Sequence, residues 1–160
     1  MHRIFSIIVF LLFFSFGFAQ TALPDSAKQL ILNEHNFYRK IVGAPPVFWS
    51  DTVEKYAIEQ VAEIIENPNN YKIDSYYGIN IYRSPENPTP TKIVEYWAKE
   101  QRYYHGEVID EKNVELVGHY TQIIWKQTFS IGCALGQTKG GVYVVVCLYN
   151  PKGNCIGCKP

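Results

Sequence analysis

Gly118-His119-Tyr120-Thr121-Gln122-Ile123-Ile124-Trp125 is the stretch of this 160-residue chain that says most about its fold. Its apolar spacing predicts a short helix over residues 115–124. Two strands are predicted after it, 130–135 and 142–149, joined by a turn at residues 138–141. The second strand reads Val-Tyr-Val-Val-Val-Cys-Leu-Tyr, and such an apolar run is typical of a central strand that is covered on both faces.

The chain before this stretch is predicted to be mainly helical. Periodic apolar positions predict helices over 25–42 and 51–66, and a third from Thr89-Pro90 to about Tyr104. Between the second and third helices, a turn-rich segment holds one alternating piece at 77–82. Helices on both sides of the late strands would be needed to cover them, so the pattern predicts an α+β layered domain.

Two local details of the early helices are specific enough to compare with a structure. Ser50-Asp51 offers an N-cap for the second helix, and Glu54 has the spacing of a capping box with Asp51. The first helix carries two neighbouring apolar stripes. One stripe is Leu30, Phe37 and Ile41, and the other is Ile31, Tyr38 and Val42.

Three segments in this order resemble the signatures of the CAP superfamily, the cysteine-rich secretory, antigen-five and pathogenesis-related proteins. They are His35-Asn36-Phe37-Tyr38-Arg39, the stretch 118–125, and Cys147-Leu148-Tyr149-Asn150-Pro151-Lys152-Gly153-Asn154. The resemblance covers about residues 27–160, and the tail is most similar to the plant pathogenesis-related branch. It implies a three-layer α-β-α sandwich with a central, mainly antiparallel sheet. The matching signature positions are His35, Asn36, Arg39, Gly78, Asn80, His119, Gln122, Trp125, Tyr149, Gly153 and Asn154.

The resemblance also implies a place where many members hold a divalent metal with two histidines and two glutamates. His119 and Glu100 match one ligand of each kind, but the other glutamate position is occupied by Ile79 and residues 66–77 contain no histidine. Structural zinc takes four protein ligands and catalytic zinc three. We therefore expect no metal, no cofactor and no catalytic residue. For Glu100 and His119 the plainer expectation is a hydrogen-bonded pair, with a weak metal site and acid–base catalysis as alternatives.

The four cysteines allow three pairings. Cys133 and Cys147 lie on the two predicted late strands, so a bridge between them is reasonable and the resemblance implies this pair. Cys155 and Cys158 form a C-x-x-C next to the end of the chain, where a tail disulfide and two exposed thiols both stay open.

The amino-terminal end of the chain predicts the compartment, and the charge balance limits the partners. Residues 1–19 have a basic start, an apolar run through Phe16 and small residues at a cleavage site before Gln20, which is the pattern of a secretory signal peptide. The apolar run is shorter than the about 20 residues of a spanning helix. We expect residues 20–160 to form one CAP domain that is secreted, extracellular, monomeric and not membrane-spanning. With 15 basic and 15 acidic side chains in the whole chain, nucleic acid is not an expected partner.

Three functions follow from these observations. The first is a non-enzymatic defence or host–pathogen protein that binds a sterol, another lipid or a protein partner, with an apolar cleft lined by Tyr77, Ile79, Tyr103 and Tyr104. The second is a precursor that releases Pro151–Pro160 as a signalling peptide, as similar plant proteins do, although Leu148 and the two tail cysteines depart from their pattern. The third and least favoured is a metal-dependent hydrolase.

Overall fold

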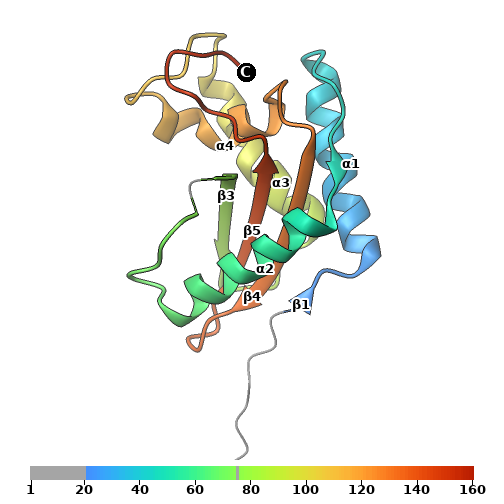
Figure 1. Cartoon of the computed structure of the whole chain (residues 1–160), viewed down its shortest axis with the longest axis vertical. Helices are drawn as coiled ribbons and strands as arrows, with labels where there is room; N and C mark the ends of the chain where they lie inside the picture. The colour runs from blue at the N-terminus through green and yellow to red at the C-terminus, as the bar shows by residue number, and fades with distance from the viewer. Residues whose placement is uncertain (1–20, 75) are drawn as a thin grey trace, which may run out of the picture.

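The structure is a computed structural model that describes residues 21–74 and 76–160. The predicted signal peptide, residues 1–19, lies outside the described residues. The elements in chain order are β1 (Thr21–Ala22), α1 (Asp25–Ile41), β2 (Phe48–Trp49), α2 (Asp51–Glu66), β3 (Gly78–Ser84), α3 (Pro90–Ala98), the 3-10 helix η1 (Lys99–Tyr103), α4 (Val114–Ile124), β4 (Ser130–Gln137) and β5 (Tyr143–Asn150) (Figure 1). None of the helices in these ranges is long and apolar enough to cross a membrane.

The five strands form one sheet in the order β1-β4-β5-β3, with β2 also paired to β4. All pairs are antiparallel except β2 with β4. Strand β5 lies between β3 and β4, and six of its eight residues are buried, as its apolar sequence predicts. The pairing places Cys133 opposite Cys147, and these two residues form a disulfide across β4 and β5.

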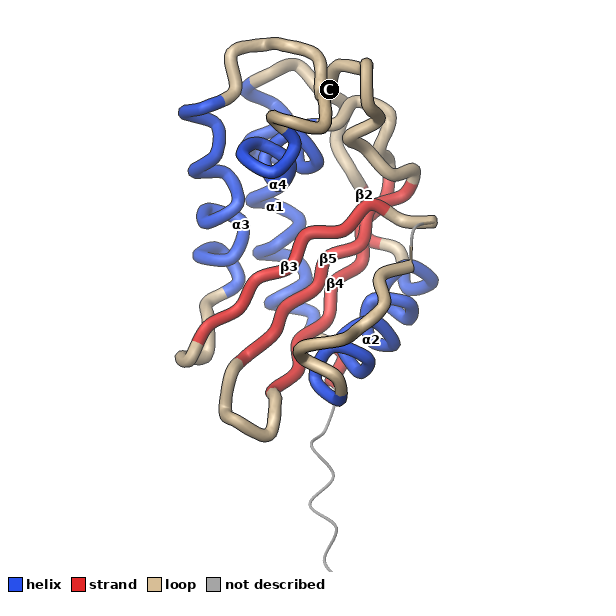
Figure 2. Tube along the Cα trace, turned by 90° about the vertical axis from the view of Figure 1, so that its left-hand side faces the viewer, coloured by secondary structure: helices blue, strands red, loops and turns tan. Residues whose placement is uncertain are grey.

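Helices cover both faces of this sheet, which makes the predicted three-layer α-β-α sandwich. Figure 2 shows α2 on one face and α1, α3 and α4 on the other. Two clusters of buried apolar residues match these two interfaces: Ile31, Trp97 and Tyr149 belong to the larger one, and Val61 and Val144 to the one under α2. The fold class predicted from the sequence is therefore confirmed.

The N-cap of α2 lies one residue earlier than the predicted capping box requires. Ser50 is the N-cap, and its side chain accepts a hydrogen bond from the backbone N–H of Val53 at 3.3 Å. The backbone N–H of Ser50 donates to Ile131 in β4, so it is not available to Glu54. The Glu54 carboxylate instead accepts from Nζ of Lys28 at 2.7 Å. The capping-box prediction is wrong because Ser50, and not Asp51, is the N-cap, which puts Val53 rather than Glu54 at the N3 position.

Only part of one predicted stripe of α1 enters the core. Leu30, Phe37 and Ile41 are 45%, 56% and 57% exposed. The buried side of the helix consists of Ala27, Ile31, His35 and Arg39. The sequence pattern missed this side because two of its four members are polar, and their burial depends on partners that lie elsewhere in the chain.

Candidate functional site

Glu100 and His119, the two remaining positions of the family metal site, come together between η1 and α4. One carboxylate oxygen of Glu100 lies 2.6 Å from Nδ1 of His119. The other accepts hydrogen bonds from the backbone N–H groups of His119 at 2.8 Å and Tyr120 at 3.1 Å. The imidazole stacks on the indole of Trp97, with ring centroids 6.3 Å apart. The His119 side chain is 37% exposed and that of Glu100 20%, so the pair is fixed in place at the surface.

These two side chains are the whole donor set at this position. Within residues 21–74 and 76–160, no three His, Cys, Asp or Glu side chains gather closely enough to hold a metal ion. Ile79, at the position of the missing glutamate, packs against the apolar cluster under α2. Both oxygens of Glu100 already accept hydrogen bonds from α4. The arrangement can orient the imidazole and join η1 to α4, but it supplies fewer ligands than a zinc site needs.

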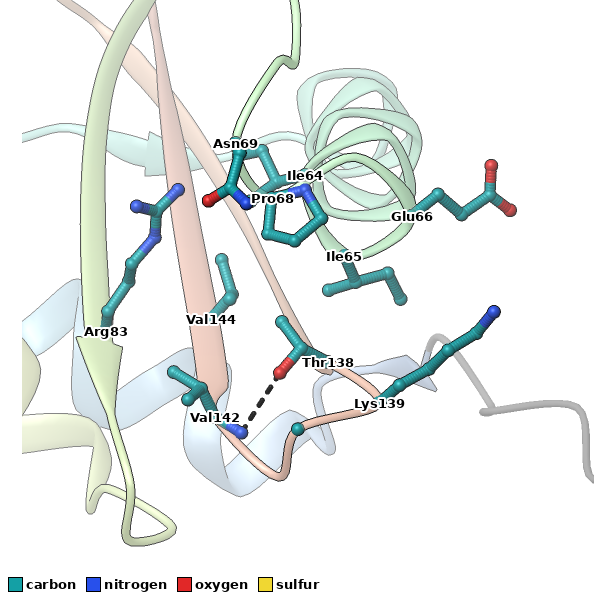
Figure 3. A pocket seen from close by; sticks show the side chains of 11 residues that line it. Ile64, Ile65, Glu66, Pro68, Asn69, Arg83, Thr138, Lys139, Val142 and Val144 are labelled. Atoms are coloured by element: carbon teal, nitrogen blue, oxygen red, sulfur yellow. Dashed lines mark hydrogen bonds between the residues drawn. The ribbon is translucent and has the colours of Figure 1, made fainter.

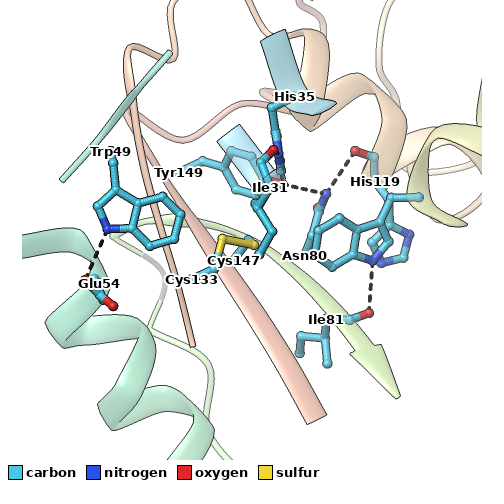
Figure 4. The surroundings of a disulfide bond; sticks show 11 residues. Ile31, His35, Trp49, Glu54, Asn80, Ile81, His119, Cys133, Cys147 and Tyr149 are labelled. Carbon is cyan, nitrogen blue, oxygen red and sulfur yellow. Dashed lines mark hydrogen bonds between the residues drawn. A yellow bond between two sulfur atoms is a disulfide. The ribbon is translucent and has the colours of Figure 1, made fainter. Parts of the chain in front are cut away.

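A second group of signature residues forms a buried polar network beside the Cys133–Cys147 disulfide (Figure 4). His35 is fully buried, and burial, with a smaller contribution from the charge of Arg39, lowers its pKa to about 4. The neutral ring donates from Nδ1 to the carbonyl of Ile31 at 2.8 Å, and Nε2 accepts from the hydroxyl of Tyr149 at 2.8 Å. The Asn80 amide donates to the same hydroxyl and to the carbonyl of His119, each at 3.0 Å. The network therefore connects α1, β5, β3 and α4.

Arg39 is a buried cation that carbonyl groups surround. Its guanidinium donates to the carbonyl oxygens of Pro45, Ile123, Trp125 and Thr128 at 2.6 to 2.8 Å. Burial lowers its pKa to about 10, so the side chain keeps its charge at neutral pH. Two of the acceptors lie at the carboxyl-terminal end of α4, where the helix dipole favours a positive charge. The neighbouring signature residue Asn36 bonds both backbone groups of Val47.

The remaining signature residues hold the carboxyl-terminal segment against α4. Gln122 is buried and accepts from the backbone N–H of Gly153 at 2.9 Å. A side chain at Gly153 would collide with the ring of Trp125, so this position needs glycine, and one at Gly78 would displace the amide group of Gln122. Asn154 donates to the carbonyl of Gly118 at 2.8 Å and accepts from the Thr121 hydroxyl at 2.7 Å.

Beyond Asn154, a second disulfide joins Cys155 to Cys158. Cys158 packs against the cluster of Ile109, Val117 and Trp125. Backbone hydrogen bonds pair Ile109 with Cys158 at 2.8 Å and Gly157 with Ile109 at 2.7 Å. The segment that the precursor hypothesis would release is thus bound to the domain by side-chain and backbone hydrogen bonds, while the Cys155–Cys158 disulfide closes a loop within the segment itself.

The four residues predicted to line one apolar cleft lie on opposite faces of the sheet. Ile79 and Tyr77 pack in the cluster under α2. Tyr104 packs against the cluster around Ile109, and Tyr103 is exposed on η1. Alternation along β3 explains the separation, because it turns Ile79 toward α2 while its neighbour Asn80 faces α4. The structure therefore does not form this cleft.

An apolar hollow does exist on the α2 side, at a place that the sequence analysis did not indicate. It has a volume of about 490 Å³ and lies between the end of α2, β3 and the turn that joins β4 to β5 (Figure 3). Its apolar lining consists of Ile64, Ile65, Pro68, Val142 and Val144. Small-molecule sites typically occupy 300–1,000 Å³ and are mainly apolar. We call this site the α2 hollow.

Charged and polar side chains stand around the α2 hollow. Arg83 and Asn69 lie at one end, and Lys139 and Glu66 at the other (Figure 3). Thr138 is buried, and its hydroxyl accepts from the backbone N–H of Val142 at 3.1 Å, which fixes the turn. The sequence contained a signal for this site in the glycine-rich turn and in Arg83, which continues the alternation of Ile79 and Ile81.

Comparisons with known proteins agree with this architecture. Residues 32–149 match the family model CAP, the cysteine-rich secretory protein family. Over 137 residues the chain is 34% identical to pathogenesis-related protein 1C of Nicotiana tabacum, covering 85% of this chain and 82% of that one. It is 29% identical over 141 residues to pathogenesis-related protein 1 of Arabidopsis thaliana, covering 86% of each.

Solved structures show the same fold. The crystal structure of NaASP2 with Zn²⁺ superposes with a TM-score of 0.73 at 21% identity, covering 89% of this chain and 88% of that one. The crystal structure of MpPR-1i gives a TM-score of 0.61 at 20% identity, covering 84% and 94%. The three signature segments, the sandwich and these matches place the chain in the CAP family of cysteine-rich secretory proteins.

Proposed function

We propose that this chain is a secreted, defence-related CAP protein that binds a sterol or another lipid in the α2 hollow and catalyses no reaction. The observation that carries the proposal is the hollow itself, with five apolar side chains on its lining and a volume of about 490 Å³. Its relatives are pathogenesis-related proteins by name, which supports the defence role. The predicted signal peptide supports secretion.

The α2 hollow suits an apolar ligand better than the hollow on the other side of the same helix. That second hollow also measures about 490 Å³, but Glu59, Glu63 and Asp74 line it. Carboxylates around a site raise the cost of bringing an apolar molecule there, since each would lose water. The α2 hollow has one carboxylate, Glu66, at its far end.

The arrangement at His119 supports a non-catalytic role. The pair with Glu100 supplies one imidazole and one carboxylate, and that carboxylate already accepts three hydrogen bonds. A hydrolytic zinc site needs a third protein ligand and an open position for water. We therefore assign the pair to holding η1 on α4.

The test is a binding titration of the protein expressed from this 160-residue sequence. The ligands are a fluorescent sterol and a fluorescent fatty acid, and each titration is made with zinc and with a chelator. The proposal predicts saturable binding of at least one of these lipids with the same affinity in both conditions. Absence of binding to both lipids would overturn it. Tight zinc binding, or hydrolysis that the chelator abolishes, would favour the metal-dependent alternative.

A further inference from the structure

We infer that the Cys155–Cys158 disulfide is a redox latch. A dithiol reductant opens this disulfide while the bridge between β4 and β5 stays closed. Opening frees the end segment, residues 155–160, from the 105–113 loop that precedes α4. The inference does not depend on the lipid binding proposed above, because other residues line the α2 hollow.

The two disulfides differ in their access to solvent. Cys133 and Cys147 are fully buried in the sheet, and helices cover both of its faces (Figure 2). Cys155 is exposed, and Cys158 is half-buried. Thiol–disulfide exchange needs a thiolate that reaches one of the two sulfur atoms. A reductant in solution can therefore attack Cys155, whereas the buried bridge is out of its reach as long as the domain is folded.

The exchange takes two steps. The first thiolate of the reductant bonds to Sγ of Cys155, the S–S bond of the protein breaks, and its electron pair leaves on Cys158, which then takes a proton. The second thiolate of the reductant attacks the reductant's own sulfur in this mixed disulfide and releases Cys155, which is also protonated. The protein disulfide has then gained two electrons and two protons, and the dithiol has become a disulfide.

The closed latch attaches the 105–113 loop to α4. Asn154, the residue before Cys155, makes two side-chain hydrogen bonds to α4. The disulfide joins Cys155 to Cys158, whose carbonyl accepts from the backbone N–H of Ile109 at 2.8 Å. The backbone N–H of Gly157 donates in turn to the carbonyl of Ile109 at 2.7 Å. The disulfide thus connects a residue that is fixed on α4 with one that is paired to the loop.

Opening the latch leaves a weaker connection. Only the backbone of Ile156 and Gly157 then joins the two cysteines, and Gly157 has a φ of 84°, a region that glycine enters readily. Chain ends that nothing ties down are usually poorly ordered. In the loop, Asp110 and Asn113 bond to each other, so these contacts do not replace the lost attachment. We therefore expect the end segment and the loop to separate.

Separation should uncover a small apolar cluster. Cys158 packs against Ile109, Val117 and Trp125, which are 0%, 1% and 3% exposed. Departure of Cys158 removes part of their cover. The reduced protein therefore presents an apolar surface beside α4 that the oxidised protein keeps closed.

The domain itself should stay folded when the latch opens. The sequence separation of the two cysteines is 3 in the latch and 14 in the buried bridge. In the chain-entropy model, a disulfide that closes a shorter loop restricts the unfolded chain less and stabilises the fold less. The latch therefore controls local order, and the buried bridge supports the sheet.

The first experiment measures which disulfide is reduced. The protein expressed from this 160-residue sequence is treated with dithiothreitol without denaturant, and free thiols are trapped with iodoacetamide and located by peptide mass mapping. We expect Cys155 and Cys158 to be labelled at least tenfold faster than Cys133 and Cys147. Equal rates would overturn the inference. Loss of the far-UV circular dichroism signal during this reduction would also overturn it, because the opening would then not be local.

The second experiment measures local order by hydrogen exchange of single backbone N–H groups. We expect those of Ile109 and Gly157 to exchange at least tenfold faster in the reduced protein than in the oxidised one. Val146, which is buried in the central strand β5, is the internal control and should not change. Unchanged exchange at Ile109 and Gly157 would contradict the latch.

A pair of variants separates the disulfide from its surroundings. Cys155→Ser removes the bond at an exposed position and leaves Cys158 in its packing. It should show the fast exchange at Ile109 without reductant, and dithiothreitol should not increase it further. Ile156→Ser is the matched control, because Ile156 is 56% exposed between the two cysteines and its substitution keeps the disulfide. Slow exchange in Cys155→Ser would show that hydrogen bonds alone hold the end segment, and would overturn the inference.

Discussion

His35 illustrates how a single buried side chain can join distant parts of this chain. The imidazole lies in α1, yet its partner Tyr149 is the penultimate residue of β5. Burial favours the neutral ring, and the neutral ring is the form that can accept the hydroxyl of Tyr149 at one nitrogen while donating to Ile31 at the other. The side chain that resembles a metal ligand by residue type is thus fully engaged in the core.

This burial predicts how stability depends on pH. Folding lowers the pKa of His35 from its ordinary 6.5 to about 4. Between these values the unfolded state binds more protons, so the free energy of unfolding falls as the pH falls from 6.5 to 4. The shift corresponds to about 3 kcal/mol. Urea denaturation across this range should show a smaller pH slope for His35→Gln, while the exposed His105→Gln keeps the wild-type slope. Equal slopes in wild type and His35→Gln would contradict the assignment.

At the scale of elements, the polar contacts that matter are those that fix one helix to another or to the sheet. Arg39 holds the end of α1 to the end of α4 and to the segments at Pro45 and Thr128. On the other face, α2 lies so close to β4 that Gly132 leaves no room for a side chain. These two contacts position the layers on either side of the sheet.

Shortening the cation should loosen the first contact. Lysine keeps the charge of Arg39 but cannot reach four carbonyl oxygens with one ammonium group. We expect Arg39→Lys to lower the free energy of unfolding by about 3 kcal/mol, as when one partner of a buried charged group is lost. Chemical denaturation at neutral pH measures this change in the free energy of unfolding. Lys40→Arg, at an exposed position of the same helix, is the control. An Arg39→Lys protein as stable as wild type would show that the carbonyl contacts contribute little.

A methyl group should disturb the second contact. An added Cβ at Gly132 would collide with the backbone of Val53 and Glu54, which cannot move as a flexible side chain does. Gly132→Ala should therefore lower the free energy of unfolding by about 3 kcal/mol, the upper range for overpacking. Gly140→Ala adds the same methyl group where its only contact within 4 Å is the Thr138 hydroxyl, at 3.8 Å. It should change the free energy of unfolding by less than about 1 kcal/mol. A small effect at Gly132 would mean that α2 can shift away from the sheet without cost.

At the scale of the whole molecule, the family signature and the α2 hollow are built from different residues. The signature residues at 35–39, 118–125 and 147–154 form the interface of α1, α4 and the tail. The α2 hollow lies on the opposite face of the sheet, and its lining comes from segments without a signature. Family membership therefore specifies the sandwich, while the proposed lipid site depends on residues outside the signature segments.

This separation explains what could be predicted from the sequence. The apolar run of β5, the apolar spacing of α2, and the order of helices before strands depend on local patterns, and the predicted layers followed from them. The predicted cleft of Tyr77, Ile79, Tyr103 and Tyr104 was wrong because Tyr77 and Ile79 face α2, whereas Tyr103 and Tyr104 belong to η1 and its C-cap on the other face of the sheet. The α2 hollow forms only where the end of α2, β3 and the turn between β4 and β5 come together. Local sequence patterns do not indicate which distant segments lie side by side.

The most direct test of the account is one lipid titration on two variants of this protein, Gly140→Trp and His119→Gln. The first fills the α2 hollow, and the second removes the imidazole of the remnant family site. The account predicts that Gly140→Trp lowers lipid affinity at least tenfold and that His119→Gln leaves it unchanged. The reverse result, with binding lost in His119→Gln and kept in Gly140→Trp, would contradict it and place the ligand at the family site.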